Sequence, residues 1–501
     1  MAQLNRGRVS DPAQAALSGS QNEAPGSAGV VSLVARHIPR CEEMLEIGIA
    51  HRWRSYLGRS NHNLERENAD QFPMVEQRGQ TVMNLKFRIL AVVVVFTTLL
   101  GLYSARLWPA SQTNSNFEMY YTAAYLVRQN MSVHIYDAVN REANPEIIYA
   151  DPSTVWAKTA HAHGINRVTL YLYPPILADL VVPLTFFPVI PALVVWHILG
   201  ILMIVGISVT LTRTLDMGFS GSIVLLSAAV LLFRPTLSTF HWGQASVVIA
   251  FLVTIGLSLY VQGHKNVAAL LLVLAIAIKL EPIALIVPVI VWRDWKFLRS
   301  MAVWGLLLCL GMWAVNGTEA LKLYFLYQLP AMSGGKLGTG SADVNRTLGN
   351  IFYAYLDGML SSREISWLVR LISALILCSA GWLSRSKPRE KLTARRQFEI
   401  GLIFLLLVCC LSPYSWYYNW AIVAPPAVMF CKRVWDRTAD TAESAVFIAL
   451  LLSLTTSQFD MAMVSPFLGI MLGLLALYRM RLERPAQSRS PIDRLVTSSA
   501  S

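Results

Sequence analysis

The chain has 501 residues, of which 54% are hydrophobic and only 14% are charged, and its mean hydropathy is +0.47. So little charge on so long a chain, with many apolar runs of membrane-spanning length, excludes a soluble protein and predicts an all-α polytopic membrane protein. The formal net charge of +12 does not indicate nucleic-acid binding, because the Lys and Arg residues collect in short loops between apolar runs.

The six cysteines predict neither a metal site nor a disulfide framework. Five of them lie in or at the ends of apolar segments, with no CxxC or Cys/His ligand spacing: Cys309, Cys378, Cys409, Cys410 and Cys431. We interpret these five as packing residues, and we expect no metal and no other cofactor.

Residues 1–82 are polar and rich in Arg, Glu, Ser and Gln, without a long apolar run or a signal-peptide pattern. We expect a cytosolic, weakly ordered extension there. An addition that the fold does not need and a regulatory tail are both open interpretations. The transmembrane domain is predicted at 83–484, and 485–501 is predicted to be a cytosolic tail.

The apolar runs predict twelve transmembrane helices, with both ends of the chain in the cytoplasm. Lys86 and Arg88 hold the start of the first span on the cytoplasmic side. The predicted spans are 87–107, 168–188, 190–211, 219–236, 243–262, 266–292, 300–316, 366–384, 397–412, 416–431, 441–458 and 463–480. Two of the loops between them are long, 108–167 and 317–365, and both are predicted to be external.

The basic loops support this topology in the second half of the chain. From residue 293 onward they all fall on the cytoplasmic side: 293–299, 385–396, 432–437 and 479–484. Three earlier features do not fit, because Arg213 and Lys265 come out external and the HWGQ stretch at 241–244 comes out near the cytoplasm. Lys279, Glu281 and Pro282 interrupt the run 266–292, so one crossing and two short passes are both open there.

The external loop 108–167 contains the stretch with the most reactive side chains, NFEMYYTAAYLVRQNMSVHIYD. It places an amide and an acid, Asn116 and Glu118, beside the Tyr120–Tyr121 step. An amphipathic pattern near Tyr120 to Val127 predicts a helix that lies on the bilayer surface. We interpret this stretch as the reactive edge of a membrane enzyme.

Seven short motifs follow one another in order: NFEMYYTAA, IYD, YLYPP with VVPL and Trp196, HWGQ, AIKLEP with WRDW, NRTLGN and LSPYSW. In this order, from about residue 87 to 430, the chain resembles glycosyltransferase family 87. The resemblance implies a GT-C fold and an enzyme like the polyprenol-phosphate-mannose-dependent mannosyltransferases. It implies a polyprenyl-phosphate sugar donor, a glycolipid or glycan acceptor, and an active site on the external, periplasmic face of a bacterial plasma membrane.

The resemblance also implies a general base, because the family uses a carboxylate in the first external loop. The family pattern there is Asp-Phe, two residues and Tyr, whereas this chain has Asn116-Phe117 before Tyr120. An amide cannot take a proton from a hydroxyl near neutral pH, but Glu118 can. We expect Glu118 to be the base and Asn116 its hydrogen-bonding neighbour, with a solvated loop acid as the alternative for Glu118.

A lipid-phosphate sugar already carries its leaving group, so the enzyme needs cations that stabilise the departing phosphate. Arg346 in NRTLGN and Lys279 in IKLEP are the predicted cations. Glycines around Arg346 would let its loop close over a ligand, and a solvated arginine is the alternative. For Lys279, a structural pair with Glu281 is an equal alternative, since an ionisable residue within a membrane needs a partner or a function.

The remaining predicted substrate-binding residues are Tyr120, Tyr121, Asp179, Gln244 and Trp416. Asp179 lies in an apolar segment and should face the protein interior or a polar cavity. Gln244 lines the site only if the local topology is wrong, and we favour a role at a helix end. Trp416 belongs to LSPYSW, where this chain lacks the His that relatives often have shortly after the Trp.

Three functions of different classes follow from these features: a glycosyltransferase, a lipid or solute transporter, and an inactive family member that acts as an envelope-assembly scaffold. A transporter is disfavoured because the sequence shows no convincing internal repeat. Two long loops on one side of the membrane favour the enzyme. Asn116 in place of the usual aspartate keeps the scaffold open.

Overall fold

The computed structural model describes residues 116–137, 150–166, 168–217, 222–330, 347–356, 358–385, 392–412, 417–455 and 459–482. Every described residue belongs to one compact unit, Phe87–Ser501. The predicted extension, first span and C-terminal tail therefore lie outside the described residues.

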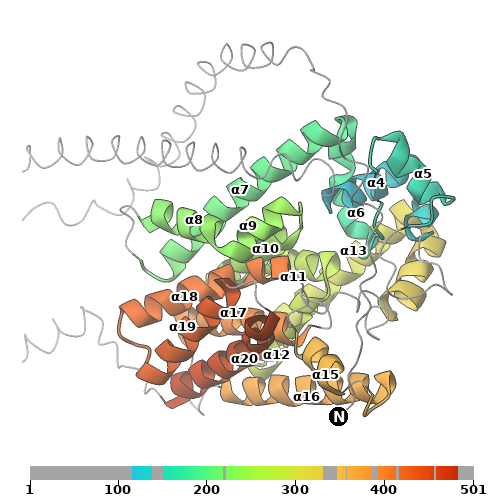
Figure 1. The fold of residues 1–501 in the computed structure, drawn as a ribbon. Coiled ribbons are helices and arrows are strands. Elements are labelled where there is room, and N and C mark those ends of the chain that lie inside the picture. The colour runs from blue at the N-terminus through green and yellow to red at the C-terminus, as the bar shows by residue number, and fades with distance from the viewer. Residues whose placement is uncertain are drawn as a thin grey trace, which may run out of the picture. The chain divides into compact units, whose positions relative to one another are not determined.

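The described part of the chain is helical and contains no β-strand, which confirms the all-α prediction for that part (Figure 1). The α-helices are α4 (Phe117–Arg128), α5 (Val155–Ala162), α6 (Pro175–Val181), α7 (Val189–Thr214), α8 (Ser222–Leu232), α9 (Arg234–His241), α10 (Ser246–Val261), α11 (Lys265–Ile278), α12 (Ile286–Val291), α13 (Trp295–Lys322), α15 (Leu348–Leu356), α16 (Ser362–Leu383), α17 (Ala394–Leu411), α18 (Ala424–Trp435), α19 (Thr441–Thr455) and α20 (Phe459–Leu482). The short 3₁₀ or π-helical segments are η2 (Ser132–Tyr136), η3 (Val182–Phe186), η4 (Glu281–Leu285), η5 (Leu323–Gln328) and η6 (Tyr417–Val423).

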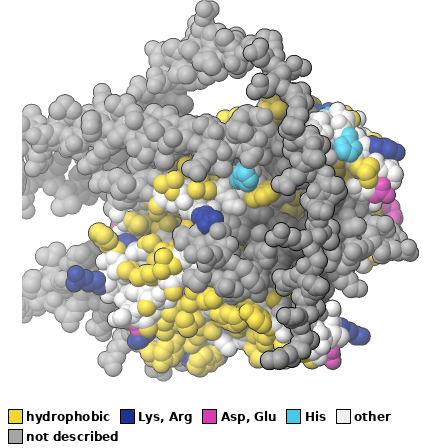
Figure 2. Space-filling view, viewed as in Figure 1, with side chains coloured by type: hydrophobic (Ala, Val, Ile, Leu, Met, Phe, Trp, Pro, Cys, Tyr) yellow, Lys and Arg dark blue, Asp and Glu magenta, His cyan; other side chains and the backbone are white. Residues whose placement is uncertain are grey.

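Four helical stretches within the described ranges are long and apolar enough to cross a membrane: Val189–Thr214, Trp295–Gln328, Ser362–Leu383 and Val464–Leu482. They correspond to four of the predicted spans, and the other predicted spans in this part of the chain coincide with shorter or interrupted helices. Apolar side chains cover their outer surfaces, as Figure 2 shows for the surface over α16 and α20. Such a surface is suited to lipid hydrocarbon.

Helix α13 runs beyond the predicted end of its span. We expected a span at 300–316 and then a loop, but the helix continues to Lys322 and passes directly into the π-helical segment η5. Gly317, with φ 74° and ψ 174°, interrupts its regular geometry at the predicted boundary. The start of the predicted loop 317–365 is therefore helical, and α13 consists of two helical stretches that meet in a kink at Gly317.

Residues 168–188 do not form the predicted crossing. The helices α6 and η3 together hold 12 residues, about 20 Å of helix against a hydrocarbon core of about 30 Å. Both flanks of this segment contact α4. The Tyr173 ring, before α6, packs edge-on against Tyr120 with centroids 5.1 Å apart, and the Phe187 carbonyl, after η3, accepts a 2.8 Å hydrogen bond from the Tyr121 hydroxyl.

The run 266–292 also returns to the side from which it starts. Lys265 Nζ, at the start of α11, lies 2.5 Å from Asp294 Oδ2, just after α12. The chain reverses where Lys279 is extended (φ −152°, ψ 127°) and Pro282 removes a backbone N–H. Of the two interpretations of this run, the reversal favours two short passes.

These two changes correct the predicted topology of the first half and leave the second half unaltered. Thr214, at the end of α7, lies 2.9 Å from Ser258 near the end of α10, which places Arg213 at the same end of the helices as Lys265. The other end of α10 begins beside HWGQ, which contacts α4. Arg213 and Lys265 thus lie at the same end as the RDWK segment, and HWGQ lies at the same end as the loop 108–167. With this arrangement, none of the three features disagrees with the predicted positions of the basic loops any longer.

Cysteine labelling tests this corrected arrangement. Cysteines introduced at His264 and Lys296, both exposed, should react with an impermeant maleimide from the same side of the membrane. A cysteine at Asp151, in the described part of the loop 108–167, should react from the opposite side. Labelling of His264→Cys and Lys296→Cys from opposite sides would restore the predicted crossing at 266–292.

Candidate functional site

Three polar side chains from distant segments meet beside α4. The hydroxyls of Tyr120 and Tyr173 each donate a 2.7 Å hydrogen bond to Oε1 of Gln244. All three residues are buried, and we refer to them as the Tyr–Gln cluster. Gln244 therefore does more than satisfy a helix end, and the interpretation that we favoured from the sequence is wrong. Tyr173, whose role the sequence analysis missed, stands in the aromatic YLYPP motif.

The HWGQ turn fixes the beginning of α4. Gly243 has a φ of +61°, and a Cβ there would lie 2.8 Å from the Cβ of Phe117. The backbone N–H of Asn116 donates to the Trp242 carbonyl at 2.7 Å, and the Trp196 indole donates to the Gly243 carbonyl at 3.2 Å. Only glycine satisfies both the positive φ and the close contact, which explains this residue between Trp242 and Gln244.

The predicted helix near Tyr120 is present as α4, but it does not lie on a surface. Ten of its 12 residues are buried, including Glu118, which is 6% exposed. The interpretation of Glu118 as a solvated loop acid is therefore wrong. Glu118 lies in the first turn of α4, where the helix macrodipole stabilises a carboxylate. Asn116 is the N-cap residue, and its side chain makes no capping hydrogen bond.

Lys279 and Glu281 form an ion pair at the reversal between α11 and α12. Lys279 Nζ lies 2.8 Å from Glu281 Oε1, and their side chains are 14% and 13% exposed. The Ser412 hydroxyl, from LSPYSW, donates to the same carboxylate at 3.1 Å. This geometry confirms the structural pair, and Tyr173 of the Tyr–Gln cluster lies within electrostatic range of both charges.

Asp179 faces the protein interior, as expected from its apolar surroundings. The Asn316 amide nitrogen, from α13, donates to both of its carboxylate oxygens at 2.9 and 3.0 Å. The Tyr136 hydroxyl, from the IYD motif, donates to the Tyr173 carbonyl at 2.8 Å. Asn316 was not predicted as a site residue, because nothing local distinguishes one asparagine near the end of a long apolar helix.

Tyr121 points away from the Tyr–Gln cluster, toward the Phe187 carbonyl and the ring of His163. Burial raises the pKa of the Tyr121 phenol, and nearby Arg128 partly offsets this effect. Burial and, to a smaller extent, the nearby Arg128 lower the pKa of His163. Two further predicted site residues, Arg346 and Trp416, lie outside the described residues.

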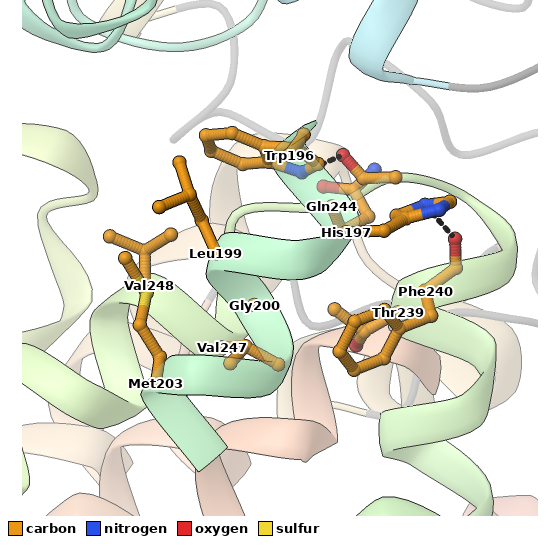
Figure 3. A pocket seen from close by; sticks show the side chains of 11 residues that line it. Trp196, His197, Leu199, Gly200, Met203, Thr239, Phe240, Gln244, Val247 and Val248 are labelled. Carbon is orange, nitrogen blue, oxygen red and sulfur yellow. Dashed lines mark hydrogen bonds between the residues drawn. The ribbon is translucent and has the colours of Figure 1, made fainter. Parts of the chain in front are cut away.

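A mainly apolar pocket adjoins the cluster between α7, α9 and α10 (Figure 3). Gln244 and His197 give it polar groups, and His197 Nε2 lies 3.0 Å from the Phe240 carbonyl. Among the side chains that the structure describes, no group of three His, Cys, Asp or Glu residues is placed to hold a metal ion.

Replacing Gln244 by leucine should lower the free energy of unfolding by about 1–3 kcal/mol, because the tyrosine hydroxyls lose a buried acceptor. Unfolding in mixed detergent micelles measures this loss. Gln262→Leu is the matched control, since Gln262 is exposed and should tolerate the change within about 0.5 kcal/mol. Equal losses for both variants would contradict a stabilising role of the Tyr–Gln cluster.

The sequence profile of glycosyltransferase family 87 matches residues 171–413, which confirms the resemblance of the motifs. The chain is 24% identical over 325 residues to the polyprenol-phosphate-mannose-dependent alpha-(1-2)-phosphatidylinositol mannoside mannosyltransferase of Mycolicibacterium smegmatis. This alignment covers 60% of the chain and 71% of the relative.

Two crystal structures of ArnT from Cupriavidus metallidurans show a weaker likeness. The structure bound to undecaprenyl phosphate has a TM-score of 0.31 and 14% identity, and the likeness covers 79% of this chain and 78% of ArnT. The apo structure has a TM-score of 0.27 and 12% identity, with 77% and 78% covered. At these TM-scores the likeness supports no conclusion about this chain.

Proposed function

Because the profile of glycosyltransferase family 87 matches residues 171–413, we propose that the chain is a membrane glycosyltransferase with a GT-C-type fold. It transfers a sugar, mannose in this proposal, from a polyprenyl-phosphate donor to a hydroxyl of a glycolipid or glycan acceptor. The name of the Mycolicibacterium smegmatis relative supports both the donor class and the sugar. The reaction takes place on the external face of the membrane.

The observation that carries the proposal is the convergence of the family-like motifs on one region. NFEMYY, YLYPP and HWGQ meet in the Tyr–Gln cluster, and IYD joins them through the hydrogen bond from Tyr136. IKLEP and LSPYSW meet where Ser412 contacts Glu281. The two groups of motifs lie within electrostatic range of each other, because the charges of Lys279 and Glu281 act on Tyr173. Six motifs that are scattered along the sequence thus gather in one region, as a shared site requires.

The residues in this region support a division of roles. Glu118 accepts the proton of the acceptor hydroxyl, and Asn116 is its polar neighbour at the start of α4. Lys279 stabilises the departing phosphate together with Arg346, which lies outside the described residues. Lys279 then has two roles, as a cation for the phosphate and as the structural partner of Glu281, since the ion pair also keeps the lysine charge in place.

The remaining predicted residues bind the substrate. The Tyr–Gln cluster and Asp179 supply the hydrogen-bonding groups that orient sugar hydroxyls. Tyr121 acts indirectly, by fixing α4 against the Phe187 carbonyl. Trp416 supplies an aromatic face for the sugar. This assignment uses no metal, because the donor carries its own leaving group.

Sugar transfer in proteoliposomes tests the proposal. The purified protein is given radiolabelled polyprenyl-phosphate mannose and a glycolipid extract, and we expect a labelled glycolipid product that depends on both substrates. A reaction without acceptor extract is the control for donor hydrolysis. Movement of the donor between leaflets without any product would instead support the transporter.

A further inference from the structure

The stretch from the last turn of α6 to the first turn of α7 presents unusually exposed apolar side chains. Phe186 is 73% exposed, Phe187 49%, Leu180 47% and Ile190 45%. Both flanks of the segment contact α4, and its helices are too short to cross a bilayer. These side chains therefore lie at one side of the membrane domain and not along a transmembrane path.

The same segment is tightly joined to α4. Arg128, in the last turn of α4, donates a 2.6 Å hydrogen bond to the Thr185 carbonyl, and its guanidinium lies 5.1 Å from the centre of the Phe186 ring. The Tyr121 hydroxyl binds the Phe187 carbonyl. Because of these contacts, whatever binds the side chains of Phe186 and Phe187 also fixes the position of α4.

The exposed surface of the neighbouring helix α7 indicates what binds the two phenylalanine side chains. Ile190 lies in the first turn of α7, and the exposed apolar residues Ile198 and Leu202 follow on this helix, which is long and apolar enough to cross a membrane. The exposed phenylalanines continue that lipid-facing surface at the end where α7 begins. Arg128 adds a cation at the same place, and an aromatic–cation pair suits the boundary between phosphate headgroups and acyl chains.

We propose that Leu180–Phe187 inserts from the side of α4 into the headgroup–acyl boundary of a single leaflet and anchors the site at that depth. Phe186 and Phe187 lie about 5–10 Å below the headgroups, the depth of interfacial segments. Arg128 lies at the level of the lipid phosphates. The segment thereby holds the Tyr–Gln cluster at the membrane surface, where a lipid-borne phosphate also lies.

Spin-label depth measurements test this proposal without relying on enzymatic activity. Cys41, Cys309, Cys378 and Cys431 are replaced by serine, and the buried Cys409 and Cys410 are kept. A nitroxide is attached at Phe186→Cys in vesicles of phosphatidylcholine and phosphatidylglycerol. Its accessibility to oxygen, which concentrates in hydrocarbon, is compared with that to a water-soluble nickel chelate.

Two labelled variants calibrate the depth. Leu202→Cys lies near the middle of α7 and should report the bilayer interior, and Asp151→Cys should report water. The label at Phe186, and a second one at Leu180, should lie between these limits. A label at Phe186 as deep as that at Leu202 would overturn the proposal in favour of a crossing. Nickel accessibility equal to that at Asp151 would overturn it in favour of a segment in water.

Discussion

Replacing Glu118 by glutamine should lower the rate of sugar transfer by about 100-fold or more while the chain keeps its fold. Glutamine has the shape and hydrogen-bonding reach of glutamate but cannot take a proton from the acceptor hydroxyl. Glu118 is buried in the first turn of α4, next to the segments that form the Tyr–Gln cluster, so the substitution acts inside the proposed site.

Initial rates with a purified polyprenyl-phosphate donor measure the effect. Glu364→Gln is the matched control, because Glu364 also lies in the first turn of a helix but is exposed and far along the chain. It loses the same favourable interaction with a helix macrodipole and should keep the parent rate. If Glu118→Gln transfers sugar at the rate of the parent, another residue is the base, and Asp179 is the next candidate.

Asn116→Asp belongs to the same experiment, because it restores the acid that the family pattern has at this position. We expect this variant to match or exceed the rate of the parent, since Asn116 precedes α4 and makes no capping hydrogen bond that the change would break. If the parent transfers no sugar and only Asn116→Asp does, the chain is a family member that has lost its chemistry.

Lys279→Met should lower the free energy of unfolding by about 3–5 kcal/mol, because it leaves the Glu281 carboxylate buried without its cation. The loss should be large since the pair lies at the reversal between α11 and α12, where regular helical hydrogen bonding is also interrupted. Unfolding in mixed detergent micelles measures it.

The double variant Lys279→Met/Glu281→Gln separates the two roles of the lysine. Removing both charges should restore most of the lost stability, because no unpaired charge remains. If Lys279 also holds the donor phosphate, the stable double variant should still use the donor poorly. A single variant as stable as the parent would show that the ion pair does not support the fold.

Local sequence patterns determined the helical elements of this protein. The helix near Tyr120 and the inward position of Asp179 were both predicted. These features depend on residues a few positions apart, through side-chain periodicity and the cost of an ionisable group in apolar surroundings. Composition alone likewise indicated a membrane protein.

Only the tertiary structure decided which apolar runs cross the membrane and which residues share a site. The runs 168–188 and 266–292 are apolar enough to cross, yet the contacts at their flanks return them to the side where they begin. Reversing that local topology is what brings Gln244 to Tyr120, 124 positions earlier in the chain. Hydropathy measures the preference of a segment for lipid, whereas the path of that segment is set by hydrogen bonds and ion pairs to distant residues.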